Sequence, residues 1–333
     1  MKGKRVTHEN GAAAHDIAQV AQAAAAMRAE IAKAMVGQAQ VVDQVLAGLI
    51  AGGHVLIEGV PGLGKTLLVQ ALARTFSGTY RRIQFTPDLM PADVCGHTLY
   101  DQATRQFTTR RGPVFTHLLL ADEINRAPAK TQAALLEVMQ ELQVTIEGAA
   151  LPLEPPFMVL ATQNPIEHEG TYALPEAQLD RFLLKVRIDY PDHAEETQLV
   201  RQVTAGQVGD RLNVDAVTPV ITPEGVLALQ RAAAQLRLDD AVQDYAVRIV
   251  RATRTWSGVA AGAGPRGGIA LVRAARAAAL LAGRDFVTPD DVKGMALSAL
   301  RHRVTPSPEL EIEGHGADSI LHALLEKTSA PRQ

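Results

Sequence analysis

The feature that most restricts how this chain can fold is a glycine-rich octapeptide that lies between two regular-looking segments. Residues 59–66 read Gly-Val-Pro-Gly-Leu-Gly-Lys-Thr and match the pattern G-x-x-x-x-G-K-[ST] at every fixed position. Residues 54–58 before it have the length and composition of a buried strand, and residues 67–75 after it carry apolar side chains at helical spacing. A strand that turns through such a loop into a helix is the context in which this pattern binds phosphate groups.

This loop supplies the groups that would hold ATP. Its glycines let the backbone N–H groups point at phosphate oxygens, and the helix start adds partial positive charge. Lys65 is expected to reach the β- and γ-phosphates, and the Thr66 hydroxyl is expected to ligate Mg²⁺. A chance glycine-rich turn is the alternative, but it would not need these flanking elements. The expected nucleotide contacts are Gly59, Val60, Pro61, Gly62, Leu63, Gly64, Lys65, Thr66 and Leu67.

The rest of the chain divides into two regions with different patterns. Apolar runs at 116–121, 157–162 and 182–188, and a further candidate strand at 82–85, alternate with helical patterns such as 130–143, which predicts a parallel sheet covered on both faces. Strand signals stop after residue 191, and helices are predicted at 195–203, 223–235, 240–255, 268–282, 289–300 and 317–327. We therefore expect an α/β nucleotide-binding domain over 31–190 and a smaller, all-helical domain over 191–333. Before them, residues 1–30 would form a disordered tail of about eleven residues and an Ala-rich helix.

Two acidic residues and an asparagine follow predicted strands. Asp122 and Glu123 end an apolar run and would emerge at the carboxyl edge of the sheet, beside the phosphate-binding loop. Asp122 would hold Mg²⁺ through water, and Glu123 would orient and polarise the attacking water. Asn164 ends the next strand, where its amide could bond the γ-phosphate and this water. The alternatives are a strand that simply ends in solvent and, for Asn164, a turn residue before Pro165.

Two arginines could stabilise charge on a transferred phosphoryl group. Arg181 precedes the last predicted strand, and Arg266 opens a predicted helix in the segment Gly-Pro-Arg-Gly. The alternative is a surface ion pair, for which Asp180 is an available local partner.

Composition excludes several classes of protein. Cys95 is the sole cysteine, so the chain has no internal disulfide and no zinc-ligand spacing. No segment approaches about 18 consecutive apolar residues, so we expect no membrane-spanning helix and interpret the chain as cytoplasmic. The formal net charge of −3 gives no support to nucleic-acid binding by the whole surface.

Together these segments resemble the AAA+ ATPases and, within them, the MoxR-type group. The resemblance covers roughly residues 30–310 and is carried by the loop at 59–66 (Walker A), 118–128 (Walker B and after), 161–165 (sensor 1), 174–182, 264–266 and 283–292. It implies a P-loop NTPase core followed by a helical lid, with ATP and Mg²⁺ as ligands.

The resemblance also implies roles for residues that spacing alone does not assign. Arg181 matches the arginine finger, which acts on ATP held by a neighbouring subunit, and Arg266 matches sensor 2, which could act within its own chain or across the interface. Val36, Gly37 and Gln38 match the segment near the adenine. Residues of about 81–113 resemble the helix-2 insert, and residues of about 144–157 resemble the hairpin before sensor 1. Both features usually face the pore of a ring.

The resemblance implies a chaperone-like ATPase that forms a homo-oligomeric ring, most often a hexamer, and remodels or matures a protein client. A protein with a von Willebrand factor A-type domain is an expected partner. One alternative is a nucleic-acid motor, since helicase relatives share the insert and Arg105, Arg110 and Arg111 give it basic character. The few aromatic candidates for base stacking, mainly Tyr100 and Phe107, count against it. Another is a slow, ATP-dependent regulatory switch. The sequence does not name the client or fix the ring's stoichiometry.

Overall fold

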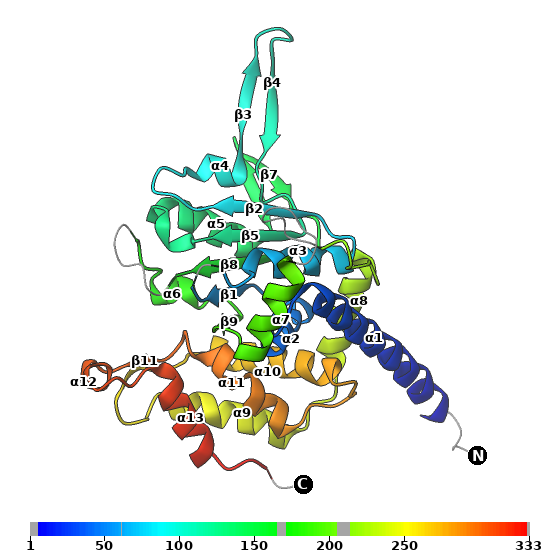
Figure 1. Ribbon diagram of the computed structural model, residues 1–333, viewed down its shortest axis with the longest axis vertical. Helices are drawn as coiled ribbons and strands as arrows, with labels where there is room; N and C mark the ends of the chain where they lie inside the picture. The colour runs from blue at the N-terminus through cyan, green and yellow to red at the C-terminus, as the bar shows by residue number, and fades with distance from the viewer. Residues whose placement is uncertain (1–5, 61, 165–170, 205–213, 332–333) are drawn as a thin grey trace.

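The computed structural model describes residues 6–60, 62–164, 171–204 and 214–331. Its centre is a sheet of five parallel strands in the order β2-β5-β8-β1-β9, which confirms the predicted α/β core (Figure 1). The strands are β1 (Val55–Glu58), β2 (Tyr80–Gln84), β5 (Leu118–Asp122), β8 (Met158–Gln163) and β9 (Leu184–Arg187). Strand β1 lies between β8 and β9, so the loop after β1 emerges near the middle of the carboxyl edge.

Both faces of this sheet are covered, which is why its central strands begin with buried apolar residues and carry polar ones only toward their carboxyl ends. Successive side chains of a strand point to opposite faces. Leu120 therefore packs into the hydrophobic cluster formed with helices α1 (Val6–Ala34), α2 (Ala39–Ile50) and α3 (Lys65–Thr75). Leu119 packs into a second cluster with helix α5 (Ala129–Glu141).

Helix α1 corrects one expectation about the start of the chain. The first eleven residues were expected to be disordered, but the helix begins at Val6. Extending a helix by one residue costs much less than starting one, so the Ala-rich helix can continue into the less favourable residues before it. Residues 1–5 lie outside the described residues.

Two hairpins interrupt the alternation of strands and helices. The first follows the short helix α4 (Pro91–Cys95), consists of β3 (Gly96–Asp101) and β4 (Gln106–Arg111), and projects from the body at the end opposite the C-terminal helices (Figure 1). The second consists of β6 (Gln143–Ile146) and β7 (Ala149–Pro152). They occupy the two segments that resemble the helix-2 insert and the hairpin before sensor 1.

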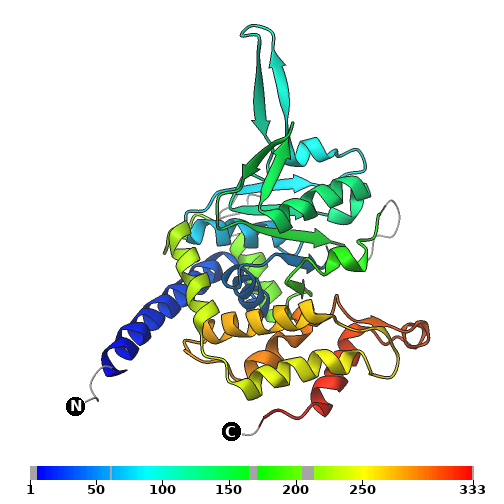
Figure 2. The ribbon, with the colours of Figure 1, turned by 180° about the vertical axis from the view of Figure 1, so that it is seen from behind.

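The C-terminal part is helical, as predicted, and packs beneath the sheet (Figure 2). Its helices are α7 (His193–Thr204), α8 (Pro223–Gln235), α9 (Asp240–Thr253), α10 (Pro265–Leu281), α11 (Pro289–Leu300), α12 (Pro308–Ile312) and α13 (Ala317–Lys327). The Thr222 and Thr288 hydroxyls cap α8 and α11 by accepting backbone N–H groups. The expectation of an all-helical region is wrong in one detail, because β10 (Val259–Ala261) and β11 (Thr305–Pro306) form a small antiparallel pair. Strands this short leave no readable alternation of side chains. The proposed domain limits stay a prediction.

Within the described residues, none of the helices has the length and apolar composition of a membrane span.

Candidate active site

The carboxyl edge of the sheet carries a cavity of about 320 Å³ that brings together the three predicted site segments. The phosphate-binding loop, the end of β5 and the end of β8 all contribute to its wall, as the order of these strands requires. Its lining residues are Gly62, Gly64, Lys65, Thr66, Leu67, Arg82, Gln84, Asp122, Glu123 and Asn164. Sequence reasoning predicted all of them except Arg82 and Gln84.

Local backbone geometry explains the glycines of the loop. Gly64 is the N-cap of α3 and has φ +79°, in the left-handed region that only glycine adopts freely. A Cβ at Gly59 would lie 2.6 Å from the backbone oxygen of Ile188, so this position requires a close approach between two chain segments. Val60 and Leu63 complete the described part of the loop, and Pro61 lies outside the described residues.

Lys65 is the first residue of α3, and its ammonium nitrogen donates a hydrogen bond to the Gly59 carbonyl oxygen at 2.6 Å. Burial lowers the pKa of this ammonium, and the nearby charges of Asp122 and Glu123 act in the opposite direction. The side chain thus lies folded over the loop, on the same side as the two acids.

Thr162 orients both acids at the end of β5. Its hydroxyl donates to Asp122 Oδ1 at 2.5 Å and accepts the backbone N–H of Glu123 at 2.8 Å. Glu123 has φ +54°, an uncommon conformation for a residue with a side chain, and the bond to Thr162 helps to hold it. The sequence analysis did not predict a role for Thr162. A hydroxyl near the end of an otherwise apolar strand was a usable signal, because such a group is buried and needs a hydrogen-bond partner, as it is here.

Strand β2 supplies two further contacts to the acids. Arg82 donates to Asp122 Oδ2 through Nη2 at 2.5 Å and Nε at 3.2 Å, and Gln84 donates to Glu123 Oε2 at 2.7 Å. Arg82 also donates to Gln84 Oε1 at 3.1 Å, while Arg126 pairs with Glu123 Oε2 at 3.3 Å. Positions 82 and 84 share a face of β2 because side chains alternate, so the predicted strand contained this signal as well.

The residues at this edge fit Mg²⁺. Thr66 and Asp122 line one cavity and offer hydroxyl and carboxylate oxygens, which are the ligands that this cation prefers. The described part of the chain holds no group of three or more His, Cys, Asp or Glu side chains arranged for a metal. Mg²⁺ usually takes only one or two carboxylates together with substrate phosphates, so the pair suffices.

Asn164 and the expected adenine segment occupy different places. Asn164 is buried and lines the cavity at the end of β8. Val36, Gly37 and Gln38 lie in the link between α1 and α2 and do not line the cavity, but the preceding Met35 lies beside Gly64, which does. Gln38 donates to the Asp189 carbonyl oxygen at 2.7 Å, which ties this link to the segment that follows β9.

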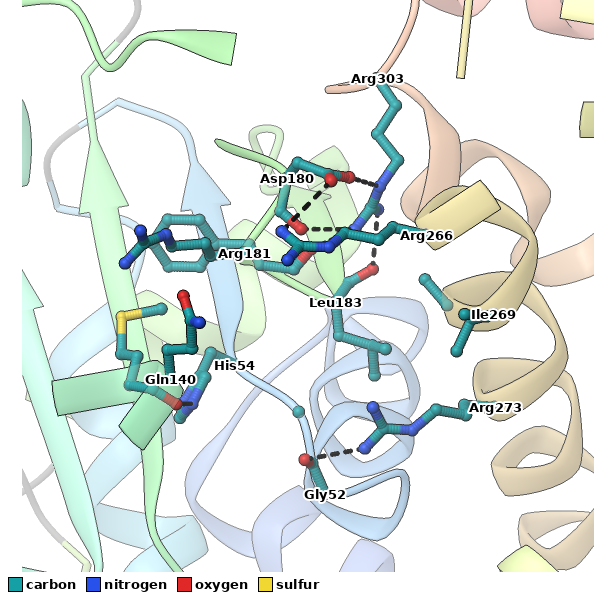
Figure 3. A pocket seen from close by; sticks show the side chains of 14 residues that line it. Gly52, His54, Gln140, Asp180, Arg181, Leu183, Arg266, Ile269, Arg273 and Arg303 are labelled. Atoms are coloured by element: carbon teal, nitrogen blue, oxygen red, sulfur yellow. Dashed lines mark hydrogen bonds and ion pairs between the residues drawn. The ribbon is translucent and has the colours of Figure 1, made fainter. Parts of the chain in front are cut away.

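The two predicted arginines line a second cavity, of about 300 Å³, at the amino edge of the sheet (Figure 3). Arg181 lies just before β9 and donates to the Leu136 carbonyl oxygen at 2.7 Å. Arg266, the second residue of α10, lies 3.6 Å from Asp180 Oδ2. The ion pair that the sequence left open therefore exists for Arg266, whereas Arg181 has a backbone partner.

These arginines do not meet the phosphate-binding loop within one chain. Strands β1 and β9 pair in register from Val55 and Leu184, so Arg181 lies before their start and the loop lies after their end. A strand of four residues spans roughly 13 Å. No residue lines both cavities.

Known proteins share this arrangement of core and lid. Residues 54–184 match the family described as "ATPase family associated with various cellular activities (AAA)", and residues 251–324 match the "AAA lid domain". The chain is 44% identical over 317 residues to Chaperone MoxR1 of Mycobacterium tuberculosis, which covers 91% of this chain and 81% of the relative. It is 33% identical over 332 residues to Protein MoxR of Methylorubrum extorquens, covering 93% of this chain and 95% of the relative.

A solved structure has the same fold over nearly its whole length. The crystal structure of a protein from Cytophaga hutchinsonii, described as a candidate ATPase, superposes with a TM-score of 0.89 at 39% identity. The match covers 97% of this chain and 99% of that one.

Proposed function

We propose that this chain, which belongs to the MoxR group of AAA+ ATPases, completes its ATP site between neighbouring subunits of a ring and uses hydrolysis to remodel a protein partner. Family membership establishes nucleotide binding and ATP hydrolysis. The shared site, the ring and the protein partner are the proposal.

The observation that carries the proposal is the separation of the two cavities. An arginine that stabilises charge on the γ-phosphate is worth about 10³- to 10⁵-fold in rate. Arg181 and Arg266 lie at the amino edge of the sheet, a strand's length from Lys65 in the same chain. A neighbouring subunit could bring its amino edge to this carboxyl edge, and repetition of such a head-to-tail contact closes a ring.

The roles proposed for the residues follow from their positions. Lys65 and the loop amides hold the β- and γ-phosphates, while Thr66 and Asp122 hold Mg²⁺. When bound, Mg²⁺ neutralises charge on the phosphate oxygens. Glu123 orients and polarises the attacking water, after its carboxylate leaves Gln84.

The other proposed roles belong to residues around that centre. Asn164 bonds the γ-phosphate and the water. Arg181 and Arg266 of the neighbouring subunit stabilise the charge that develops on the phosphoryl group. Val36, Gly37 and Gln38 contact the adenine.

The β3–β4 hairpin favours a protein client. Tyr100 and Phe107 form a cross-strand pair with ring centroids 5.1 Å apart, yet their exposed fractions are 52% and 75%. Exposed aromatic pairs on a projecting element are typical of surfaces that bind other proteins. The chaperone name of the relative MoxR1 supports the same reading. The chain would act as a hexameric ring in the cytoplasm, together with a partner that carries a von Willebrand factor A-type domain.

The same hairpin supports a second candidate, a nucleic-acid motor. Arg105, Arg110 and Arg111 are exposed beside the aromatic pair, and such a surface could bind a single strand by charge and stacking. The net charge of −3 opposes this candidate. Salt-dependent binding to single-stranded DNA or RNA would favour it over a protein client.

The shared site is tested by measuring the ATPase rate against protein concentration, with mass determined in parallel. We expect the rate per subunit to rise as oligomers form. Arg181→Ala should assemble and bind ATP normally but lose about 10³-fold or more in kcat. The matched control is Arg248→Ala, which removes an exposed arginine of α9 that pairs with Asp244. A monomer that hydrolyses ATP at the full rate and is indifferent to Arg181→Ala would refute the shared site.

A further inference from the structure

Asp180 lies between two arginines of the C-terminal helical part, and its two carboxylate oxygens serve one each (Figure 3). Oδ1 accepts from Arg303 Nε at 2.7 Å, and Oδ2 lies 3.6 Å from Arg266 Nη1. Asp180 itself belongs to the core, where it is the residue before Arg181 and ends helix α6 (Glu176–Leu179).

Arg303 is an anchor and not a ligand-binding group. Its side chain is 4% exposed, and a buried charge of this kind is tolerated only when it is fully paired. Besides Asp180 Oδ1, its guanidinium donates to the backbone oxygens of Asp180, Phe182, Leu183 and Ala299. Its Nη1 also lies 2.7 Å from His302 Nε2, so the five N–H groups of the guanidinium are all engaged within the protein. The bonds from Arg303 thereby fix the position of Asp180.

Arg266 has the opposite character. Its side chain is 61% exposed, and Asp180 is the acid with which it pairs. Its position depends on the first turn of α10 lying against Arg303, because a Cβ at Gly267 would be 3.2 Å from Arg303 Cδ. Glycine at 267 allows this approach, which brings Arg266 within reach of the carboxylate that Arg303 holds.

We propose that Asp180 is a positioning residue, which Arg303 fixes and which in turn holds Arg266 beside Arg181 so that both guanidinium groups are presented together to the phosphates of a neighbouring subunit's ATP. This inference rests on the proposed shared site. It assigns to Asp180 a role in catalysis through Arg266, without contact to the nucleotide.

The test compares two substitutions that leave Arg303 a partner. Asp180→Asn keeps an oxygen for Arg303 Nε but removes the charge that attracts Arg266. Asp180→Glu keeps the charge and displaces it by one methylene, so it remains informative if the neutral variant fails to assemble. Because a misplacement of about 1 Å can cost about 10²-fold in rate, we expect each variant to lose at least about tenfold in kcat while its Kd for ATP and its oligomer mass stay unchanged.

The decisive measurement is the coupling to Arg266. In an Arg266→Ala background, neither substitution at Asp180 should lower kcat further, whereas a merely structural role of Asp180 would lower it in both backgrounds. Asp244→Asn is the control, since it breaks the pair with Arg248 on the surface of α9 and should leave kcat and coupling unaffected. Full kcat in both Asp180 variants, or an equal loss with and without Arg266, would overturn the proposal.

The same variants separate this inference from the shared site on which it rests. If Arg181→Ala and Arg266→Ala both keep the full rate, the shared site itself is wrong. If they lose activity while the Asp180 variants do not, only the positioning role fails.

Discussion

Replacing Thr162 by valine should slow hydrolysis without weakening ATP binding. The substitution keeps the shape of the side chain and removes the hydroxyl that joins Asp122 to the backbone of Glu123. Thr162 is fully buried, so water cannot easily replace the lost group. Both acids would lose the contact that sets their direction, while the phosphate-binding loop would stay intact.

The expected size of the effect follows from these two hydrogen bonds. A bond donated to an ionised carboxylate contributes about 1.5–3 kcal/mol, and leaving the buried Glu123 N–H without an acceptor costs about 1–3 kcal/mol. If the carboxylate bond measures how firmly the acids are held for reaction, its loss corresponds to about 10- to 150-fold in kcat, since 1.36 kcal/mol is a factor of ten. We therefore expect a lower kcat together with a lower free energy of unfolding.

Thr253→Val separates the two effects. Thr253 is also fully buried and also makes one donated and one accepted hydrogen bond, to the Val250 oxygen and from the Ala263 N–H, but it lies in helix α9. Steady-state ATPase assays well below the unfolding temperature should show normal kcat for this control and a reduced kcat for Thr162→Val. Equal kcat in the two variants, at normal ATP affinity, would refute the role given to Thr162.

Three further substitutions test other parts of the structure. Lys65→Ala should raise the Kd for ATP in a titration with a fluorescent analogue, and unchanged affinity would contradict the assignment of the loop. Burial lowers the pKa of His54 to about 4, so the free energy of unfolding should fall as the pH drops from 6.5 toward 4, by up to roughly 1.4 kcal/mol per unit. His302 is also buried with a lowered pKa, so His54→Gln should reduce this dependence in denaturant titrations without removing it, and an unchanged slope would exclude a contribution from His54. Burial raises the pKa of Asp291, but the bonds from Arg284 and Thr288 together outweigh burial and leave this pKa lowered. Asp291→Asn should therefore cost about 1.5–3 kcal/mol at pH 7, a difference from wild type that shrinks only below pH 3.8, whereas the exposed Asp290→Asn should cost under about 1 kcal/mol.

Local sequence predicted the parts of the site that lie next to one another along the chain. The loop at 59–66 needs its glycines, lysine and threonine in a fixed order between a strand and a helix, so the pattern carries its own structural context. Asp122, Glu123 and Asn164 could be placed because the carboxyl ends of parallel strands meet at one edge. In these cases a short segment and one rule of sheet geometry were sufficient.

The supporting contacts could not be predicted because they depend on which strands are neighbours. Arg82 and Gln84 reach the acids only because β2 pairs with β5, and Thr162 does so only because β8 lies on the other side of β5. The sequence predicted that these strands exist but gave no order for them. The hairpin β3–β4 and the pair β10–β11 were also missed as strands, the latter because two or three residues leave no pattern.

The cavity lined by Arg181 and Arg266 also depends on contacts between distant parts of the chain. Arg266 and Arg303 come from the first turn of α10 and the turn after α11, and both pair with Asp180, the residue before Arg181. From the sequence alone, an ion pair with Asp180 was the alternative to a functional role for the arginines. That alternative assumes that an arginine in an ion pair has no N–H groups left to bind a ligand. In the structure the ion pair and a functional role are compatible. An exposed guanidinium that pairs with a fixed carboxylate still has N–H groups that can bind phosphate, and it loses less conformational freedom when it does so. If the proposed shared site is correct, an ion pair of this kind holds Arg266 in position for the phosphates of a neighbouring subunit's ATP.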